Sequence, residues 1–122
     1  MTFKKQQDRI TLEAFTTDNT DTTLLQMALE ETSFIQFNMF VKAQDDAGRS
    51  MNLVYQGSVK RLAGSPNADF VGAVQMVSNR RDAGVAWTVS TVVNAENIEV
   101  HIVGENATNI QWAVSFFMDW VF

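Results

Sequence analysis

The sequence predicts an all-β protein, a single antiparallel β-sandwich or jelly-roll-like domain of about eight strands with a short N-terminal arm. Three observations support this prediction. The 122 residues are rich in valine and threonine and include nine phenylalanines but one proline, a composition that suits pleated strands. Apolar side chains recur at every second position in several segments. Turn-forming residues separate these segments at intervals typical of a sandwich.

The clearest alternation predicts a long hairpin in the first half of the chain. From residue 35 to residue 44, apolar and polar side chains alternate, with Phe40 as an apolar exception on the polar side. The turn at residues 45–48 then reverses the chain, and residues 51–60 repeat the alternation. A helix would not keep this two-residue period.

Further strands are expected on both sides of the hairpin. Residues 24–31 include good helix formers and could form a short helix alone, but their neighbours favour a strand. Residues 78–84 are polar and are expected to link two strands. The segments that we expect to be strands are residues 10–15, 22–29, 70–77, 87–93, 98–103 and 110–118.

Charge divides the chain into two parts. The formal net charge is -5, but residues 1–9 carry +2, so the rest of the chain carries -7. We therefore expect a flexible basic N-terminal arm at residues 1–9 and a β-sandwich domain at residues 10–122. An acidic domain is poorly suited to binding nucleic acid, because phosphate recognition needs a basic face.

Composition also excludes several classes of chemistry. The chain has no cysteine and one histidine, which excludes disulfides, thiol nucleophiles and multi-histidine metal centres. No apolar run reaches the roughly 18–20 residues that cross a bilayer, and the start lacks a secretory signal, so we expect a protein made in the cytosol without membrane contact.

The titratable side chains do not suggest an active site. The carboxylate pairs at residues 18/21, 30/31 and 45/46 suit turns, and the first lacks the glycine and distant glutamate of a calcium-binding EF-hand. His101 is expected on the polar side of its strand, beside Glu99 and without a nucleophile at a motif spacing. Two basic pairs, at residues 60/61 and 80/81, could form one basic spot or simply be solvated. We expect no enzyme, no metal and no cofactor.

Several short motifs follow one another in a definite order along most of the chain. A Thr/Asp-rich opening, TTDNTDTTLLQMAL, precedes the hairpin SFIQFNMFVKAQDDAGRSMNLVYQGSVKRLAG. The segment VAWTVSTVVNAENIEVHIVGENATNIQWAVSF then supplies a Trp strand, a hairpin ending in hydrophobic-x-Val-x-Gly, and an Ile-x-Trp final strand. The characteristic residues of these later motifs are Trp87, Val100, Gly104, Ile110 and Trp112. The order and spacing of the motifs, over residues 16–116, resemble a β-sandwich module of tailed-bacteriophage virion structural proteins.

The resemblance implies a β-sandwich on a virion, either as a head decoration or cement subunit or as a tail or tail-fibre domain. No stem, collagen-like repeat or coiled-coil heptad precedes the module, which favours a small, separately encoded subunit. Its expected partners are other copies of itself in a homo-oligomer and the major capsid protein or another virion protein. The alternative is a receptor- or carbohydrate-binding module on the tail, with a glycan partner and Tyr55 or Trp87 as the aromatic platform.

Both chain ends supply candidate interface residues. Along the last strand Phe117 and Val121 point away from Phe116, Met118 and Trp120, so a sandwich would expose the first pair. The alternative is that the subunit itself covers both faces. A basic arm with an apolar ring could be ordered against an acidic neighbouring subunit. The residues that we expect to contact partners are Phe3, Lys4, Lys5, Arg9, Phe117, Trp120 and Phe122.

Overall fold

The computed structural model of the chain describes residues 6–121, and these residues form two antiparallel sheets that pack face to face. The predicted all-β sandwich is therefore confirmed. No helix in this part of the chain could span a membrane. The strands are β1 (Gln6–Thr16), β2 (Thr22–Ala28), β3 (Ser33–Asp45), β4 (Ser50–Arg61), β5 (Asp69–Phe70), β6 (Gln75–Arg81), β7 (Thr88–Asn94), β8 (Asn97–Val103) and β9 (Ile110–Trp120).

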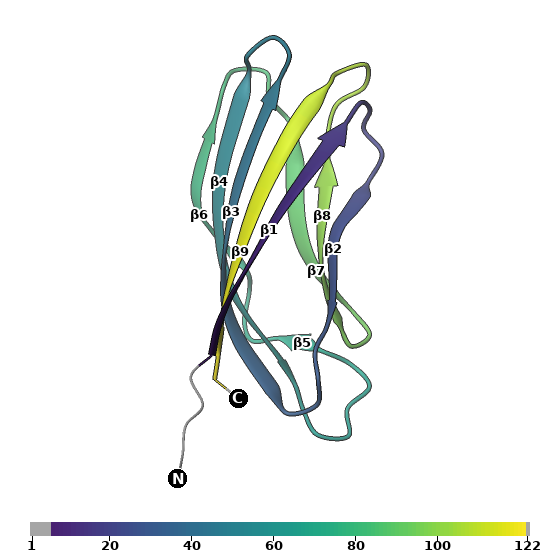
Figure 1. The fold of residues 1–122 in the computed structure, drawn as a ribbon, viewed down its shortest axis with the longest axis vertical. Coiled ribbons are helices and arrows are strands. Elements are labelled where there is room, and N and C mark those ends of the chain that lie inside the picture. The colour runs from purple at the N-terminus through teal and green to yellow at the C-terminus, as the bar shows by residue number, and fades with distance from the viewer. Residues whose placement is uncertain (1–5, 122) are drawn as a thin grey trace.

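The two sheets differ in size and place β1 and β2 on the same side of the sandwich (Figure 1). The larger sheet has six strands in the order β1-β9-β3-β4, and both β5 and β6 pair with β4. The smaller sheet has the order β2-β8-β7. Strands β3 and β4 form the predicted long hairpin without a register shift.

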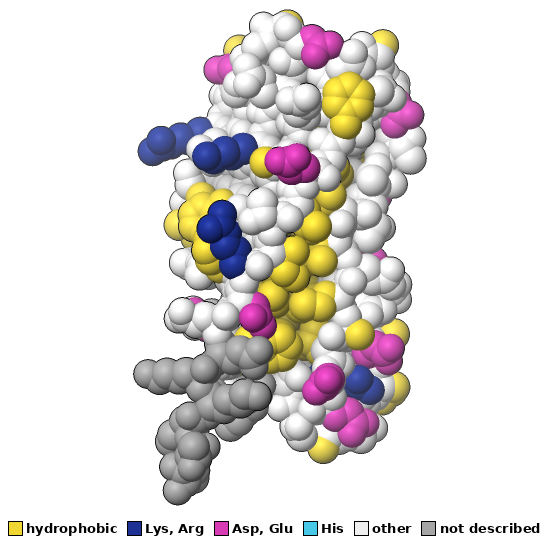
Figure 2. Space-filling model, in the orientation of Figure 1, with side chains coloured by type: hydrophobic (Ala, Val, Ile, Leu, Met, Phe, Trp, Pro, Cys, Tyr) yellow, Lys and Arg dark blue, Asp and Glu magenta, His cyan; other side chains and the backbone are white. Residues whose placement is uncertain are grey.

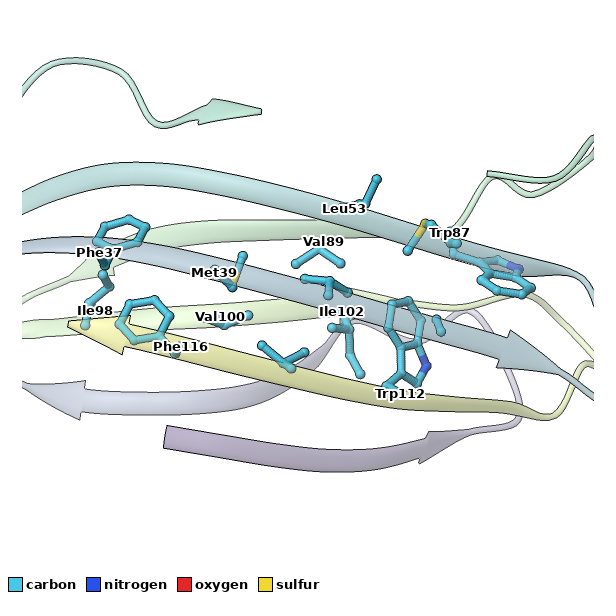
Figure 3. Packing of buried hydrophobic residues seen from close by; sticks show 14 of the residues in the cluster. Phe37, Met39, Leu53, Trp87, Val89, Ile98, Val100, Ile102, Trp112 and Phe116 are labelled. Atoms are coloured by element: carbon cyan, nitrogen blue, oxygen red, sulfur yellow. The ribbon is translucent and has the colours of Figure 1, made fainter. Parts of the chain in front are cut away.

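The core lies between the sheets and follows the predicted alternation. Along β3 and β9 every second side chain is buried, and these side chains face those of β8 (Figure 3). The rings of Phe37 and Phe116 stack with centroids 4.9 Å apart, and the indoles of Trp87 and Trp112 lie 6.2 Å apart. Burial of such large aromatic side chains is a major contribution to the stability of a small domain.

One stretch of strands differs from the prediction. Residues 70–77 do not form a single strand, because β5 ends at Phe70 and Gly72 turns the chain with a φ of 75°. Strand β6 then runs through Arg81, into the segment expected to be a polar link. The side chains of β6 are mostly exposed, so its sequence has no alternation of buried apolar and exposed polar residues. Backbone pairing with β4 holds this strand in the sheet, and such pairing cannot be recognised in the sequence.

Two other boundaries are settled by pairing between distant parts of the chain. Residues 22–28 form strand β2, which excludes the short helix considered for residues 24–31. Strand β1 begins at Gln6, four residues before the expected start of the first strand at residue 10, because residues 6–9 pair with the last residues of β9. Residues 1–5 of the arm lie outside the described residues.

Candidate functional site

The outer face of the six-stranded sheet carries the candidate residues that the structure brings together. Strand β9 presents Phe117 on this face, and β1 pairs Arg9 directly with it. The guanidinium of Arg9 lies 5.1 Å from the centroid of the Phe117 ring, a cation–π contact. Two candidates from opposite ends of the chain therefore form one surface.

Phe40 of β3 extends this surface. Its ring meets the Phe117 ring edge to face, with centroids 5.5 Å apart and an interplanar angle of 84°. Phe40 is 41% exposed and Phe117 is 38% exposed, although both lie on central strands of the sheet. We call Arg9, Phe40 and Phe117 the aromatic patch.

Trp120 does not belong to the aromatic patch. It is half-buried on the inner side of β9, where its indole Nε1 donates a hydrogen bond of 3.1 Å to Asp8. Phe117 and Trp120 therefore lie on opposite faces of the sheet, as the alternation of this strand predicts. Val121 is exposed, as expected. The remaining candidates lie outside the described residues and are Phe3, Lys4, Lys5 and Phe122.

A hollow of about 790 Å³ lies beside the aromatic patch on the same outer face. Lys42 of β3 and Gln111 of β9 line its floor, and Glu13 and Phe15 of β1 line one side. Arg80 of β6 lines the other side. Phe15 is 58% exposed, so the hollow combines an open aromatic ring with charged and amide side chains.

The two basic pairs of the sequence do not form one spot. Arg80 and Arg81 pair with the beginning of β4, at residues 52 and 51. Lys60 and Arg61 stand at the other end of that strand, about 30 Å away at the usual rise per residue. Arg81 is partly structural, because its guanidinium donates a hydrogen bond of 2.9 Å to the carbonyl oxygen of Trp87.

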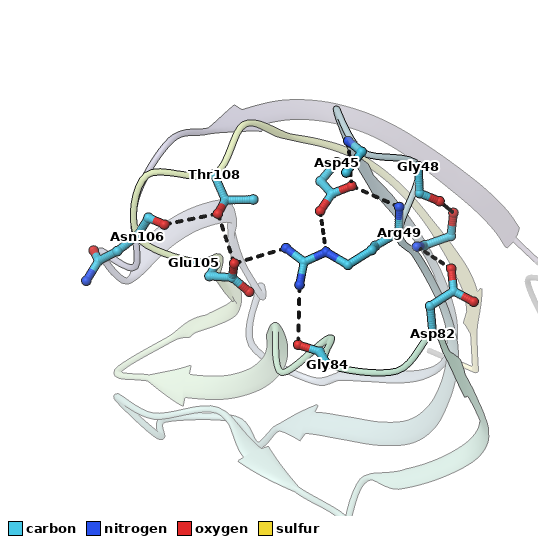
Figure 4. Close-up of polar contacts among 10 residues, drawn as sticks. Asp45, Gly48, Arg49, Asp82, Gly84, Glu105, Asn106 and Thr108 are labelled. Carbon is cyan, nitrogen blue, oxygen red and sulfur yellow. Dashed lines mark hydrogen bonds and ion pairs between the residues drawn. The ribbon is translucent and has the colours of Figure 1, made fainter.

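A polar network fixes the turn at the end of the hollow (Figure 4). The Asp45 carboxylate accepts hydrogen bonds from the backbone N–H groups of Ala47 and Arg49 and from the Arg49 side chain. Arg49 also donates to Glu105, 3.0 Å away in the β8–β9 loop. One arginine therefore joins the β3–β4 turn to the loop before β9.

The network shifts the acidity of its carboxylates. Burial alone would raise the pKa of Asp45, but the hydrogen bonds from Arg49 and Ala47 outweigh it, so this pKa lies below its ordinary value. The hydrogen bonds from Arg49 and Thr108 lower the pKa of Glu105. Both carboxylates are held in the ionised form, which suits a structural role and not proton donation.

His101 lies on the outer face of the smaller sheet between two carboxylates. Its ring nitrogens are 2.8 Å from Asp21 and 2.8 Å from Glu99. The expected place beside Glu99 is confirmed, but Glu99 is buried and not solvated. The hydrogen bonds to Asp21 and Glu99 raise the pKa of His101. Within residues 6–121 no group of acidic, histidine or cysteine side chains is arranged to hold a metal ion.

The aromatic platform considered for a glycan is absent at the two positions named for it. Trp87 is 1% exposed, and Tyr55 points into the sandwich, where its hydroxyl donates a hydrogen bond of 3.1 Å to Val89. Phe15 and Phe40 are the exposed rings that sequence reasoning missed as site residues. The signal was the same for both rings, because each is an apolar residue on the polar side of an alternating strand: Phe40 within residues 35–44, and Phe15 after Thr11 and Glu13 in residues 10–15.

No protein-family model matches the chain, and no curated protein is significantly similar to it.

Proposed function

We propose that this chain is a non-enzymatic structural protein of a bacteriophage virion. In this proposal it is a capsid decoration or cement subunit, made in the cytoplasm of the bacterial host and carried on the particle. It stabilises the head through contacts with other copies and with the major capsid protein. A subunit that binds the assembled shell and not its free components favours the shell by linkage.

The aromatic patch is the observation that carries this proposal. Two phenylalanine rings stand exposed in the centre of a sheet face, and a guanidinium lies against one of them. Aromatic side chains and arginine are the residue types that dominate the energetics of protein interfaces. Polar side chains surround the patch, among them Asn38 and Ser115 on the same strands, as in an interface with an apolar centre and a polar rim.

The residues that carry the resemblance to virion proteins have structural roles, as a shared module requires. Trp87 and Trp112 contact each other in the core. Gly104 leaves no room for a side chain, since a Cβ there would lie 2.7 Å from the Thr16 hydroxyl. These contacts explain the spacing of the motifs through packing and support the assignment to such a module.

Quantitative mass spectrometry of purified particles of the encoding phage tests the proposal. We expect this chain at a copy number in fixed ratio to the major capsid protein, and particles stripped of it should open at a lower temperature. Adding back wild-type protein should restore the opening temperature, and adding back the double variant Arg9→Ser, Phe117→Ser should not. Absence of the chain from particles, or equal heat resistance of stripped and complete particles, would refute the proposal.

The hollow beside the aromatic patch favours one second function, a receptor- or carbohydrate-binding module of the tail. Sugar sites combine an exposed aromatic ring with flanking polar groups, and Phe15 with Gln111 and Lys42 has this composition. A glycan array followed by titration tests it. Saturable binding that Phe15→Ala abolishes and Phe40→Ala preserves would support this second function over the first, and no saturable binding would exclude it.

A further inference from the structure

Strand β1 forms an unusually open edge of the larger sheet. It has 11 residues, pairs with β9 along its whole length, and shows no register shift. The other edge strands of the described sheets are short or interrupted, since β5 has two residues and β7 has seven, while the pairings of β2 and β6 contain register shifts.

Exposed edges invite pairing with another chain, and natural proteins usually block them with bulges, prolines or lysines. Residues 6–16 contain no proline and no lysine, and their outer edge pairs with no strand among the described residues. The backbone of this edge is therefore open to pairing, while the charges of Asp8, Arg9 and Glu13 restrict the partner to a strand that complements them.

We propose that the β1 strands of two copies pair antiparallel across a twofold axis at Thr11, which joins two six-stranded sheets into one continuous sheet. Thr11 is the midpoint of Gln6–Thr16, so this register overlaps the entire strand. It also places Arg9 of each copy opposite Glu13 of the other. Because a twofold interface repeats every contact, the complementary charge pair occurs twice.

Arg9 and Glu13 are available for this pair. Both side chains are exposed on the outer face of the sheet, on the same side of β1 as Thr11. Among residues 6–121 the side chain of Glu13 makes no hydrogen bond or ion pair. Opposite charges directly across an antiparallel pair are stabilising, whereas like charges there are destabilising.

Neighbouring registers do not reproduce this match. A shift by one residue would place the outer face of one copy against the inner face of the other. A shift of the pairing by two residues keeps the faces but sets Arg9 opposite Thr11 or Phe15, and the charge pair is lost. The register with full overlap is therefore the one with charge complementarity.

The inner side of β1 supports the same partner. In this register Ile10 of one copy lies opposite Leu12 of the other, and both side chains are partly exposed in the single subunit. Figure 2 shows a stripe of apolar surface that follows the side of the molecule between β1 and β2. The apolar side chains of β1 and β2 that are packed against the core but only partly buried are Ile10, Ala14, Leu24, Leu25 and Met27. Pairing two β1 edges brings this stripe beside its copy.

This inference does not depend on the proposed function, because a dimer of this kind forms in the purified protein without a capsid. The chain has no native cysteine, so any disulfide between two copies of a single-cysteine variant must join the substituted position to its own copy. Directly opposite residues in an antiparallel pair have Cβ atoms about 4.5–5.5 Å apart, close enough for a disulfide after a small adjustment. We therefore expect Thr11→Cys to give a disulfide-linked dimer under mild oxidation.

Glu13→Cys is the matched control on the same strand. Its copy lies four positions away along the partner strand, about 13 Å at the usual rise, so it should not cross-link to itself. The double variant Arg9→Cys, Glu13→Cys should cross-link. No cross-link at Thr11→Cys, or equal cross-linking of Thr11→Cys and Glu13→Cys, would overturn the proposed register.

Sedimentation velocity of charge variants tests the interface without a covalent bond. Arg9→Glu and Glu13→Arg should each raise the dissociation constant of the dimer at least about tenfold, because each sets like charges opposite one another twice. The combination of both substitutions should restore dimerisation. Lys42→Glu makes the same charge change as Arg9→Glu, away from the edge, and should leave the dimer intact. A monomer at every concentration, or failure of the double variant to restore the dimer while it unfolds like the wild type, would contradict the inference.

Discussion

The guanidinium of Arg9 lies 5.1 Å from the ring centroid of Phe117, and the two residues are direct partners in the pairing of β1 with β9. They stand near opposite ends of the chain. Sequence reasoning proposed each of them as a partner contact for a different reason, one as part of a basic arm and one as part of an aromatic tail. The sheet makes them neighbours on one exposed face, so they form a single continuous surface.

Phe116 and Phe117 offer a direct test of this face, because adjacent residues of β9 point to opposite sides. Phe116 is fully buried and stacks on Phe37. We expect Phe116→Ala to lower the free energy of unfolding by about 3–5 kcal/mol. Phe117→Ala removes an exposed ring and should lower it by about 1 kcal/mol. Urea unfolding of the two purified variants measures both values, and equal losses would contradict the assignment of the faces.

Gly57 marks a close approach between β4 and the core. A Cβ at this position would lie 2.6 Å from the ring of Phe37 and 3.1 Å from Val74. Since Phe37 is held by its stack on Phe116, we expect Gly57→Ala to lower the free energy of unfolding by about 1–3 kcal/mol.

Thermal and urea unfolding measure this loss, with Ser58→Ala as a neighbouring control that should change little. The cost of Gly57→Ala should shrink in a Phe37→Leu background, where the ring that it would meet is gone. Undiminished cost in that background would show that Phe37 is not the obstacle.

His101 should make stability depend on pH in the neutral range. Hydrogen bonds to Asp21 and Glu99 raise its pKa above the ordinary value of 6.5, so the folded state binds this proton more tightly than the unfolded state. The stabilisation is fully present below the unfolded-state pKa and is lost as the pH rises through the folded-state pKa. His101→Gln should remove this loss.

Because the chain has one histidine, its proton NMR titration is unambiguous. The measured pKa should lie above 6.5 and should fall in the Asp21→Asn variant. A wild-type value at or below the ordinary one would contradict the contacts of His101.

The carboxylates that bind Arg49 at the β3–β4 turn should make stability fall as the pH is lowered, whereas the His101 contribution falls as the pH is raised. Since the folded-state pKa values of Asp45 and Glu105 are lowered, their contribution is present above the unfolded-state values and is lost as the pH falls through the folded-state values. We expect Asp45→Asn to lower the free energy of unfolding at neutral pH. The further decrease of this free energy between neutral and acid pH should be smaller in the variant than in the wild type. Urea unfolding as a function of pH measures this slope, and an unchanged slope in the variant would count against the network.

The sequence predicts those parts of the fold in which one face is buried and the other is solvated. Strands β3 and β9 follow this rule, so their apolar alternation could be recognised. Strand β6 could not be recognised, because its side chains are mostly exposed and its place depends on backbone pairing with β4. The start of β1 was missed for the same reason, since Gln7 and Asp8 give no apolar pattern.

The candidate site was less predictable than the fold. The exposure of Phe117 follows from alternation, and this prediction is confirmed. Its contacts with Arg9 and Phe40 depend on which strands are neighbours, and the order β1-β9-β3 is a long-range property. The same order puts Phe15 beside the hollow. Sequence periodicity indicates which way a side chain points along its own strand but not which strand lies next to it.

A three-dimensional reconstruction of intact particles of the phage proposed to encode this chain is the sharpest test of the proposed virion role. We expect density for this sandwich on the head lattice, with Arg9, Phe40 and Phe117 covered by a neighbouring protein chain. Density for the chain on the tail alone, or on the head with this face open to solvent, would contradict it.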